Sequence, residues 1–137
     1  MLFRSGTTER FDDVANTHTA RTDATARRNP AGYSLNGYGF TSCGYTTDNV
    51  GTTERFDDVA NTHTARTDAT ARYGLAGYSL NGYGFTSCGY TTADVGTTER
   101  FDDVANTHTA RTDATARRLL TGYSLNEYFI NYFTMEA

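Results

Sequence analysis

The stretch AGYSLNGYGFTSCGY occupies residues 31–45 and recurs letter for letter at residues 76–90. Apolar and polar side chains alternate in each half of the stretch, and the two halves meet at Asn36-Gly37. Asn-Gly between two alternating runs is the strongest short-range signal for a β-hairpin, because both central residues of a type I′ turn need positive φ. The sequence therefore predicts a hairpin over this stretch, with its turn at Asn36 and Gly37.

A second alternating stretch, TTERFDDVANTHTART, occupies residues 7–22 and recurs at 52–67 and 97–112. Its middle, DDVAN, is rich in residues that form Asx-type turns, so a second hairpin is predicted. The adjacent carboxylates in this turn, Asp12 and Asp13 in the first copy, are interpreted as turn formers. A general acid and base pair is disfavoured because neighbours on a strand face opposite ways.

The chain is built on a period of 45 residues. Residues 6–50 align with 51–95 and differ at only five positions, while a third copy begins at residue 96 and diverges at its end into EYFINYFTMEA. We therefore divide the single repeat domain, residues 1–137, into repeats at 6–50, 51–95 and 96–137. Two hairpins, or four short strands, in a repeat of this length are typical of a β-propeller blade. Helical repeats are disfavoured because no 3.6-residue apolar stripe is present.

The composition is that of an aromatic-rich β protein with little net charge. All 12 basic residues are Arg, they are interspersed with acids, and the net charge is -4, so no basic face favours nucleic acid. No apolar run reaches membrane-spanning length, and the first residues show no signal peptide, which leaves a cytoplasmic location or an extracellular assembly open. Cys43 and Cys88 occupy the same place in successive repeats, which indicates free thiols.

The repeat resembles the kelch family over residues 6 to about 128. The family motif has a Glu-Arg-Tyr-Asp-like strand, an Asn-Thr-Trp-Thr-like strand, an Arg before the next blade and a strand ending in Gly-Gly. The matching residues of the first repeat are Glu9, Arg10, Phe11, Asp12, Asn16, Thr17, Thr19, Arg27 and Gly44. The resemblance implies a kelch-like β-propeller, a fold that often serves as a protein-binding scaffold but does not by itself set the function.

Two departures from the family motif affect the expected packing. His18, His63 and His108 stand where the family has Trp, and Cys43 and Cys88 stand where it has the first Gly of the Gly-Gly pair. Both changes weaken the apolar packing between blades. The family arrangement places the histidines on the outer strand, so packing or hydrogen bonding between blades is favoured over a ring of metal ligands.

The family strand order divides the chain into a half blade at 7–21, whole blades at 31–66 and 76–111, and a complementary half blade at 121–133. The predicted fold is therefore all-β, with about three kelch-like blade equivalents of four antiparallel strands. Because propellers typically have about four to eight blades, we expect a homodimer, in which a second chain completes a six-bladed ring by half-blade exchange. A filament and a simple fragment are the alternatives. The predicted seam residues are Glu127, Tyr128, Phe129, Ile130, Tyr132 and Phe133.

Arginine and tyrosine recur at fixed places in the repeat and allow two accounts, a ladder of ion pairs between blades or a rim that binds partners. The candidate rim residues are Arg10, Arg21, Arg27, Tyr45, Arg55, Arg66, Arg72, Tyr90, Arg100, Arg111 and Arg117. The sequence has no nucleophile elbow, phosphate-binding glycine loop or base adjacent to a cysteine, so no catalytic residue, metal or cofactor is predicted. We expect a non-enzymatic structural or protein-interaction scaffold. A carbohydrate-binding, lectin-like propeller is the alternative, and a kelch-type enzyme is the third possibility.

Overall fold

The computed structural model describes residues 5–125 and 128–133, which form antiparallel β-strands and no helix. The strands are β1 (Thr8–Asp12), β2 (Thr17–Arg21), β3 (Ala31–Leu35), β4 (Tyr38–Ser42), β5 (Thr53–Asp57), β6 (Thr62–Arg66), β7 (Ala76–Leu80), β8 (Tyr83–Ser87), β9 (Thr98–Asp102), β10 (Thr107–Arg111), β11 (Leu120–Leu125) and β12 (Tyr128–Phe133). The expectation of an all-β chain is confirmed. No helix with the length and apolar character needed to cross a membrane occurs in these described ranges.

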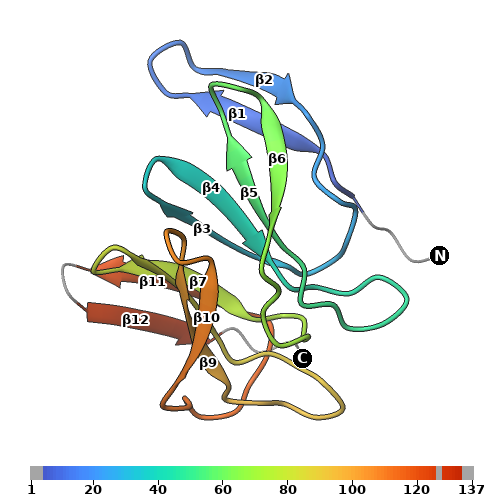
Figure 1. Cartoon of the computed structure of the whole chain (residues 1–137), viewed down its shortest axis with the longest axis vertical. Coiled ribbons are helices and arrows are strands. Elements are labelled where there is room, and N and C mark those ends of the chain that lie inside the picture. The colour runs from blue at the N-terminus through green and yellow to red at the C-terminus, as the bar shows by residue number, and fades with distance from the viewer. Residues whose placement is uncertain (1–4, 126–127, 134–137) are drawn as a thin grey trace.

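Strand pairing divides the chain into two half-sheets and two full sheets (Figure 1). We call β1–β2 the N-terminal half-sheet, β3–β6 the first full sheet, β7–β10 the second full sheet and β11–β12 the C-terminal half-sheet. In each full sheet the four strands are paired in chain order, and each is antiparallel to the next. This division into two complementary halves and two complete sheets is the one that the sequence predicts.

The inner hairpins turn where the Asn-Gly signal lies. Asn36 and Gly37 have φ values of 53° and 80°, and Asn81 and Gly82 have φ values of 52° and 77°. Positive φ at both central residues is the requirement of a type I′ turn, which matches the twist of the flanking strands. The equivalent turn of the third repeat, including the predicted seam residue Glu127, lies outside the described residues.

The outer hairpins turn on an aspartate. Asp12 Oδ1 accepts a hydrogen bond from the Ala15 amide at 2.9 Å, and the equivalent carboxylates in the later repeats accept the same bond. Asn16 closes the turn with φ 52°, a left-handed conformation that asparagine tolerates better than most residues. The first aspartate of each adjacent pair is therefore a turn former, as predicted.

The first strands of successive sheets lie next to one another. β7 contacts both β3 and β11, and the hydroxyl of Ser79 donates a hydrogen bond to the carbonyl of Ser34. Ser124 makes the same bond to Ser79 one repeat later. The N-terminal and C-terminal half-sheets lie at opposite ends of the molecule (Figure 1). The described strands of one chain thus do not close into a ring.

A cluster of buried aromatic side chains lies between the two full sheets. Tyr33 stacks on Phe40 with ring centroids 5.3 Å apart, and Phe40 meets the edge of Phe101 from the second full sheet at 5.6 Å. The Tyr33 ring lies against Gly84 so closely that a Cβ atom there would overlap with it. Glycine is therefore required at residue 84 to bring the two sheets together.

Candidate functional site

Two arginines of the predicted rim are buried, which corrects the expectation for Arg27 and Arg72. Arg27 is 5% exposed and Arg72 is 0% exposed. Arg72 Nη1 lies 2.6 Å from Glu99 Oε2, and Arg27 makes the equivalent pair with Glu54 at 3.0 Å. Each guanidinium comes from the segment that enters one full sheet and binds a carboxylate inside that sheet. Neither one is accessible to a ligand.

Burial and hydrogen bonding oppose each other at this pair. Burial would raise the pKa of the Glu99 carboxyl, but hydrogen bonds from Arg72 and Thr70 outweigh it and hold that pKa below its usual range. Thr70 donates both its amide and its hydroxyl to Glu99. The charged carboxylate is thus the stable form in the folded chain. This interior pair joins the repeats.

A second group of rim arginines forms an ion-pair ladder on the outer hairpins. Arg21 lies 2.7 Å and Arg10 lies 3.3 Å from the carboxylate of Asp58 in the following sheet. One repeat later, Arg66 and Arg55 lie 2.8 Å and 3.7 Å from Asp103. Asp58 and Asp103, the second aspartates of the two later pairs, therefore each bind two arginines of the preceding sheet. These contacts form the ion-pair ladder, one of the two accounts that the sequence allows.

The remaining rim arginines come from or directly follow the second full sheet. Arg100 lies over the Tyr83 ring at 4.3 Å, while Arg111 is exposed and Arg117 is half-buried beside Cys88. Among the residues that the structure describes, none of the three forms an ion pair with an acid. The arginines of the predicted rim are thus divided among two interior ion pairs, an outer ladder and these three side chains, and the structure does not bring them together as one surface.

His63 and His108 bind the preceding repeat. His108 Nε2 donates to the Thr67 carbonyl at 3.1 Å, His63 does the same to Thr22 at 3.0 Å, and the His108 ring lies 4.7 Å from that of Phe101. Burial lowers the pKa of His108, so its neutral form is favoured. Contact between neighbouring sheets, the interpretation favoured from sequence, is confirmed for these two histidines, whereas His18 Nδ1 lies 3.6 Å from Glu9 Oε2 within the N-terminal half-sheet. No group of three metal-ligating side chains occurs in the described part of the chain.

Both cysteines are buried free thiols at positions of positive φ. Their φ values of 63° and 64° lie in the left-handed region, which glycine adopts readily and few other residues tolerate. Burial raises the pKa of Cys43 to about 11 and raises that of Cys88 as well. The thiolate, which is the reactive form, is therefore suppressed at both positions.

The thiols are predicted to be unreactive in the folded chain. Because reaction needs both access and a thiolate, an aromatic disulfide reagent at about pH 8 should modify Cys43 and Cys88 at least about a hundredfold more slowly than in guanidinium. The release of the coloured thiol product measures both rates. Equal rates in the two conditions would contradict the burial of these side chains.

A stripe of half-buried arginine and tyrosine side chains crosses all three repeats. We call the set Arg28, Tyr45, Tyr73, Tyr90 and Arg118 the Arg–Tyr stripe. Arg28 lies over the Tyr45 ring at 4.2 Å, and Arg118 lies over the Tyr90 ring at 4.3 Å. Tyr73 connects the two halves, because its ring centroid is 5.6 Å from that of Tyr45 and 5.4 Å from that of Tyr90.

Sequence reasoning identified only the Tyr45 and Tyr90 members of the stripe. Residues 28, 73 and 118 are the same position of successive repeats and are Arg, Tyr and Arg, so this is one of the few places where the first two repeats differ. Variation in an otherwise constant repeat is the signal that could have found them. Arg118 pairs with Asp94 at 3.4 Å, whereas no ion pair to Arg28 is found within the described ranges.

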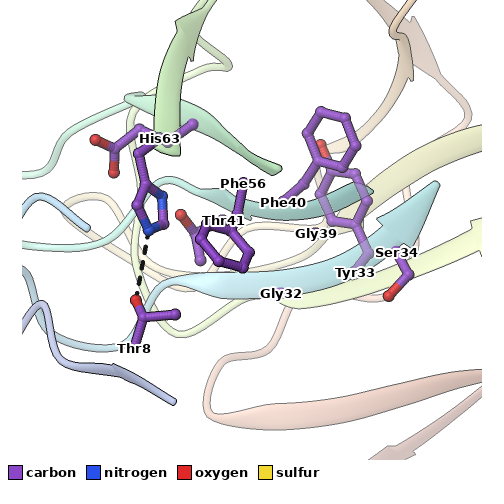
Figure 2. A pocket seen from close by; sticks show the side chains of 10 residues that line it. Thr8, Gly32, Tyr33, Ser34, Gly39, Phe40, Thr41, Phe56 and His63 are labelled. Carbon is purple, nitrogen blue, oxygen red and sulfur yellow. Dashed lines mark hydrogen bonds between the residues drawn. The ribbon is translucent and has the colours of Figure 1, made fainter. Parts of the chain in front are cut away.

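A hollow of about 380 Å³ lies between β1 and the first full sheet (Figure 2). Tyr33, Phe40, Phe56 and His63 line it together with Gly39. His63 Nε2 lies 3.5 Å from the Thr8 hydroxyl at one side of the hollow. The volume and the aromatic walls suit a ring-shaped apolar group.

The chain has no match among known protein families, and no curated protein matches it significantly.

Proposed function

We propose that this chain is a non-enzymatic kelch-like β-propeller that acts as a structural or protein-interaction scaffold. The kelch-like order of motifs within each repeat supports this, as do the four-stranded antiparallel sheets whose first strands lie side by side. A hollow of about 200 Å³ between the starts of β3, β7 and β11 lies where the central channel of a propeller would open.

The position of the ionisable groups supports a scaffold rather than an enzyme. The glutamates of the two full sheets bind buried arginines, the second aspartates bind the outer arginines, and two histidines bind backbone carbonyls. Groups held in this way join one repeat to the next. Repeat proteins derive much of their stability from such contacts between neighbours.

The Arg–Tyr stripe is the observation that carries the proposed contact with a partner protein. Arginine and tyrosine are enriched where proteins bind one another, because they combine large contact area with hydrogen bonding and charge. Arg28 adds a cation that no described acid neutralises. The surface suits an extended peptide segment that carries a carboxylate next to an aromatic or apolar side chain.

Selection of displayed random peptides against the folded chain tests this proposal. We expect acidic peptides to be enriched and their dissociation constants to rise at least about tenfold in the double variant Arg28→Ala, Tyr73→Ala. Val59→Ser is the matched control, because this valine is 99% exposed on the outer turn of the same repeat as Tyr73 and should leave binding unchanged. Peptides that bind the double variant as tightly as they bind the Val59→Ser control would contradict a role for the stripe.

The alternative function, carbohydrate binding, would also use Arg28. A guanidinium that lies over a tyrosine ring and has no acid partner among the described residues suits the carboxylate of an acidic sugar. A glycan array that gives competable binding of uronic or sialic acids, lost in Arg28→Ala, would favour this alternative over the peptide scaffold.

A further inference from the structure

The contact between the two full sheets uses a fixed set of residues from each repeat. The preceding sheet contributes Tyr33, whose ring covers Gly84, together with Arg55 and Arg66, which reach Asp103. Thr67, which follows the preceding sheet, donates its amide to Asn106 Oδ1 at 2.9 Å and accepts from His108. Since the repeats are nearly identical, the same contact can form between any two sheets that lie next to each other in this order.

At the two ends of the molecule, equivalents of the residues that connect neighbouring repeats have no partner from a neighbouring sheet among the described residues. Glu9 contacts His18 of its own half-sheet, with 3.6 Å between Oε2 and Nδ1. In the N-terminal half-sheet, Glu9 and Asp13 are exposed and Phe11 is 50% exposed, although their equivalents in the second full sheet are buried. Phe101, the equivalent of Phe11, is 1% exposed. The N-terminal half-sheet therefore presents an acidic and aromatic surface of the kind that packs against a preceding sheet in the second full sheet.

The opposite end presents the matching cations. Arg100 and Arg111 are the equivalents of the arginines that bind Asp58 and Asp103, yet no acid pairs with them among the described residues. Arg117, the equivalent of Arg72, likewise has no carboxylate there, whereas Arg72 binds Glu99. The C-terminal end of the molecule thus presents arginines without acid partners among the described residues, and the N-terminal end presents the acids that could bind them.

The hollow of Figure 2 lies beside a glycine that has no tyrosine ring over it. Gly39 in its wall is the equivalent of Gly84, which the Tyr33 ring covers, but around Gly39 the nearest atom to an added Cβ is in Phe56 at 3.8 Å. Tyr123 of the C-terminal half-sheet is the equivalent of Tyr33 and is 51% exposed. One end of the chain therefore carries the ring that the cavity at the other end can accept.

The backbone edges are complementary as well. In the first full sheet β4 pairs with β5, and Phe40 lies opposite Arg55. β12 is the equivalent of β4 and β1 is the equivalent of β5, and each is paired on one side only among the described strands. Transfer of the register places Ile130 of one copy opposite Arg10 of another, which would complete a four-stranded sheet.

We propose that two copies of this chain join head to tail, with the N-terminal half-sheet of each completing the C-terminal half-sheet of the other. Asp13 then binds Arg100 and Arg111 of the other copy, Glu9 binds Arg117, and Tyr123 fills the hollow over Gly39. The closure into a six-bladed ring rests on the proposed propeller arrangement. The dimer has two equal seams related by a twofold axis, so the free edges of β1 and β12 are paired in both copies. The predicted seam strand Tyr128–Phe133, described here by its backbone as β12, lies in this contact.

Light scattering of the 137-residue chain, combined with two glycine variants, tests the seam. We expect the mass of a dimer at micromolar concentration, and we expect Gly39→Ala to raise its dissociation constant at least about tenfold, because the added methyl meets the Tyr123 ring of the other copy. Circular dichroism should show an intact fold in this variant. Gly84→Ala is the matched control, because its methyl meets Tyr33 of the same chain and should destabilise each chain instead.

A charge exchange supplies the second test. Asp13→Arg places a third cation beside Arg100 and Arg111 at both seams. Arg111→Asp places a second acid beside Asp13 and leaves only Arg100 to balance the two. Each variant alone should therefore be monomeric. An equimolar mixture should recover the dimer mass, because a mixed dimer has a favourable pair at each seam.

Four outcomes would overturn the proposal. These are a monomeric parent chain, a dimer that none of the variants weakens, a mixture that stays monomeric, and a mass that grows without limit as the concentration rises. Peptide binding at the Arg–Tyr stripe uses residues that these variants leave unchanged. Failure of the seam is therefore distinguishable from failure of the scaffold proposal.

Discussion

Phe101→Ala is expected to lower the free energy of unfolding by about 3–5 kcal/mol. The Phe101 ring is 1% exposed and lies between Phe40 of the preceding sheet and His108 of its own hairpin. Its removal leaves a cavity at the centre of the contact between the two full sheets, where the chain has few other large apolar side chains to fill it. Urea denaturation followed by circular dichroism measures the change.

Val104→Ala is the control from the same hairpin. Val104 is 91% exposed in the turn that follows Phe101, so its truncation should change the free energy of unfolding by no more than about 0.5 kcal/mol. If Phe101→Ala cost as little as Val104→Ala, the two full sheets would not be held together through this ring.

Much of the fold was predictable from local sequence. Alternation of apolar and polar residues locates the strands because side chains in a strand point to opposite faces, and Asn36-Gly37 locates an inner turn because few other residues tolerate two successive positive φ values. The turn at Asp12 followed from the same kind of reasoning. These signals act within a few residues, so a single sequence contains them completely.

Burial was less predictable because it depends on the neighbouring repeat. Phe11 and Phe101 stand in the same local sequence, TERFD, and yet one is 50% and the other 1% exposed. What differs is whether another sheet precedes them. Likewise, Arg72 is buried because it meets Glu99, which lies 27 residues further along the chain. Alternation of charges in the sequence indicates ion pairs but does not say which of them lie inside.

The Arg–Tyr stripe could be predicted only in part for a different reason. Tyr45 and Tyr90 belong to the constant part of the repeat, whereas Arg28, Tyr73 and Arg118 occupy a position that varies. Strand patterns give no weight to such a position, because it lies outside the strands. The stripe forms only when Arg28 and Tyr45 pair across an isolated bridge, as Tyr73 and Tyr90 do one repeat later.

Arg72→Ala is expected to cost about 3–5 kcal/mol, because it leaves the buried Glu99 carboxylate without its cation. Arg72 also donates to the carbonyl of Cys88 and to the hydroxyl of Thr86, so the variant removes several bonds within the second full sheet. Arg10→Ala is the control. Its partner Asp58 is about as exposed as Arg10 itself, and pairs of this kind contribute about 0–1 kcal/mol.

The effect of Arg72→Ala should depend on pH in a direction that follows from Glu99. In the parent chain the pKa of Glu99 is lowered on folding, so this carboxylate stabilises the fold above its unfolded pKa of about 4.3, and the stabilisation is lost as the pH falls through the folded value. In the variant we expect the pKa of Glu99 to be higher than in the parent chain, because burial is no longer opposed by Arg72, and protonation of Glu99 on acidification then relieves the unpaired charge. The difference in unfolding free energy between the two proteins should therefore shrink between about pH 7 and pH 3. A difference that stays constant across this range would mean that Arg72 stabilises the sheet by packing and not through its pair with Glu99.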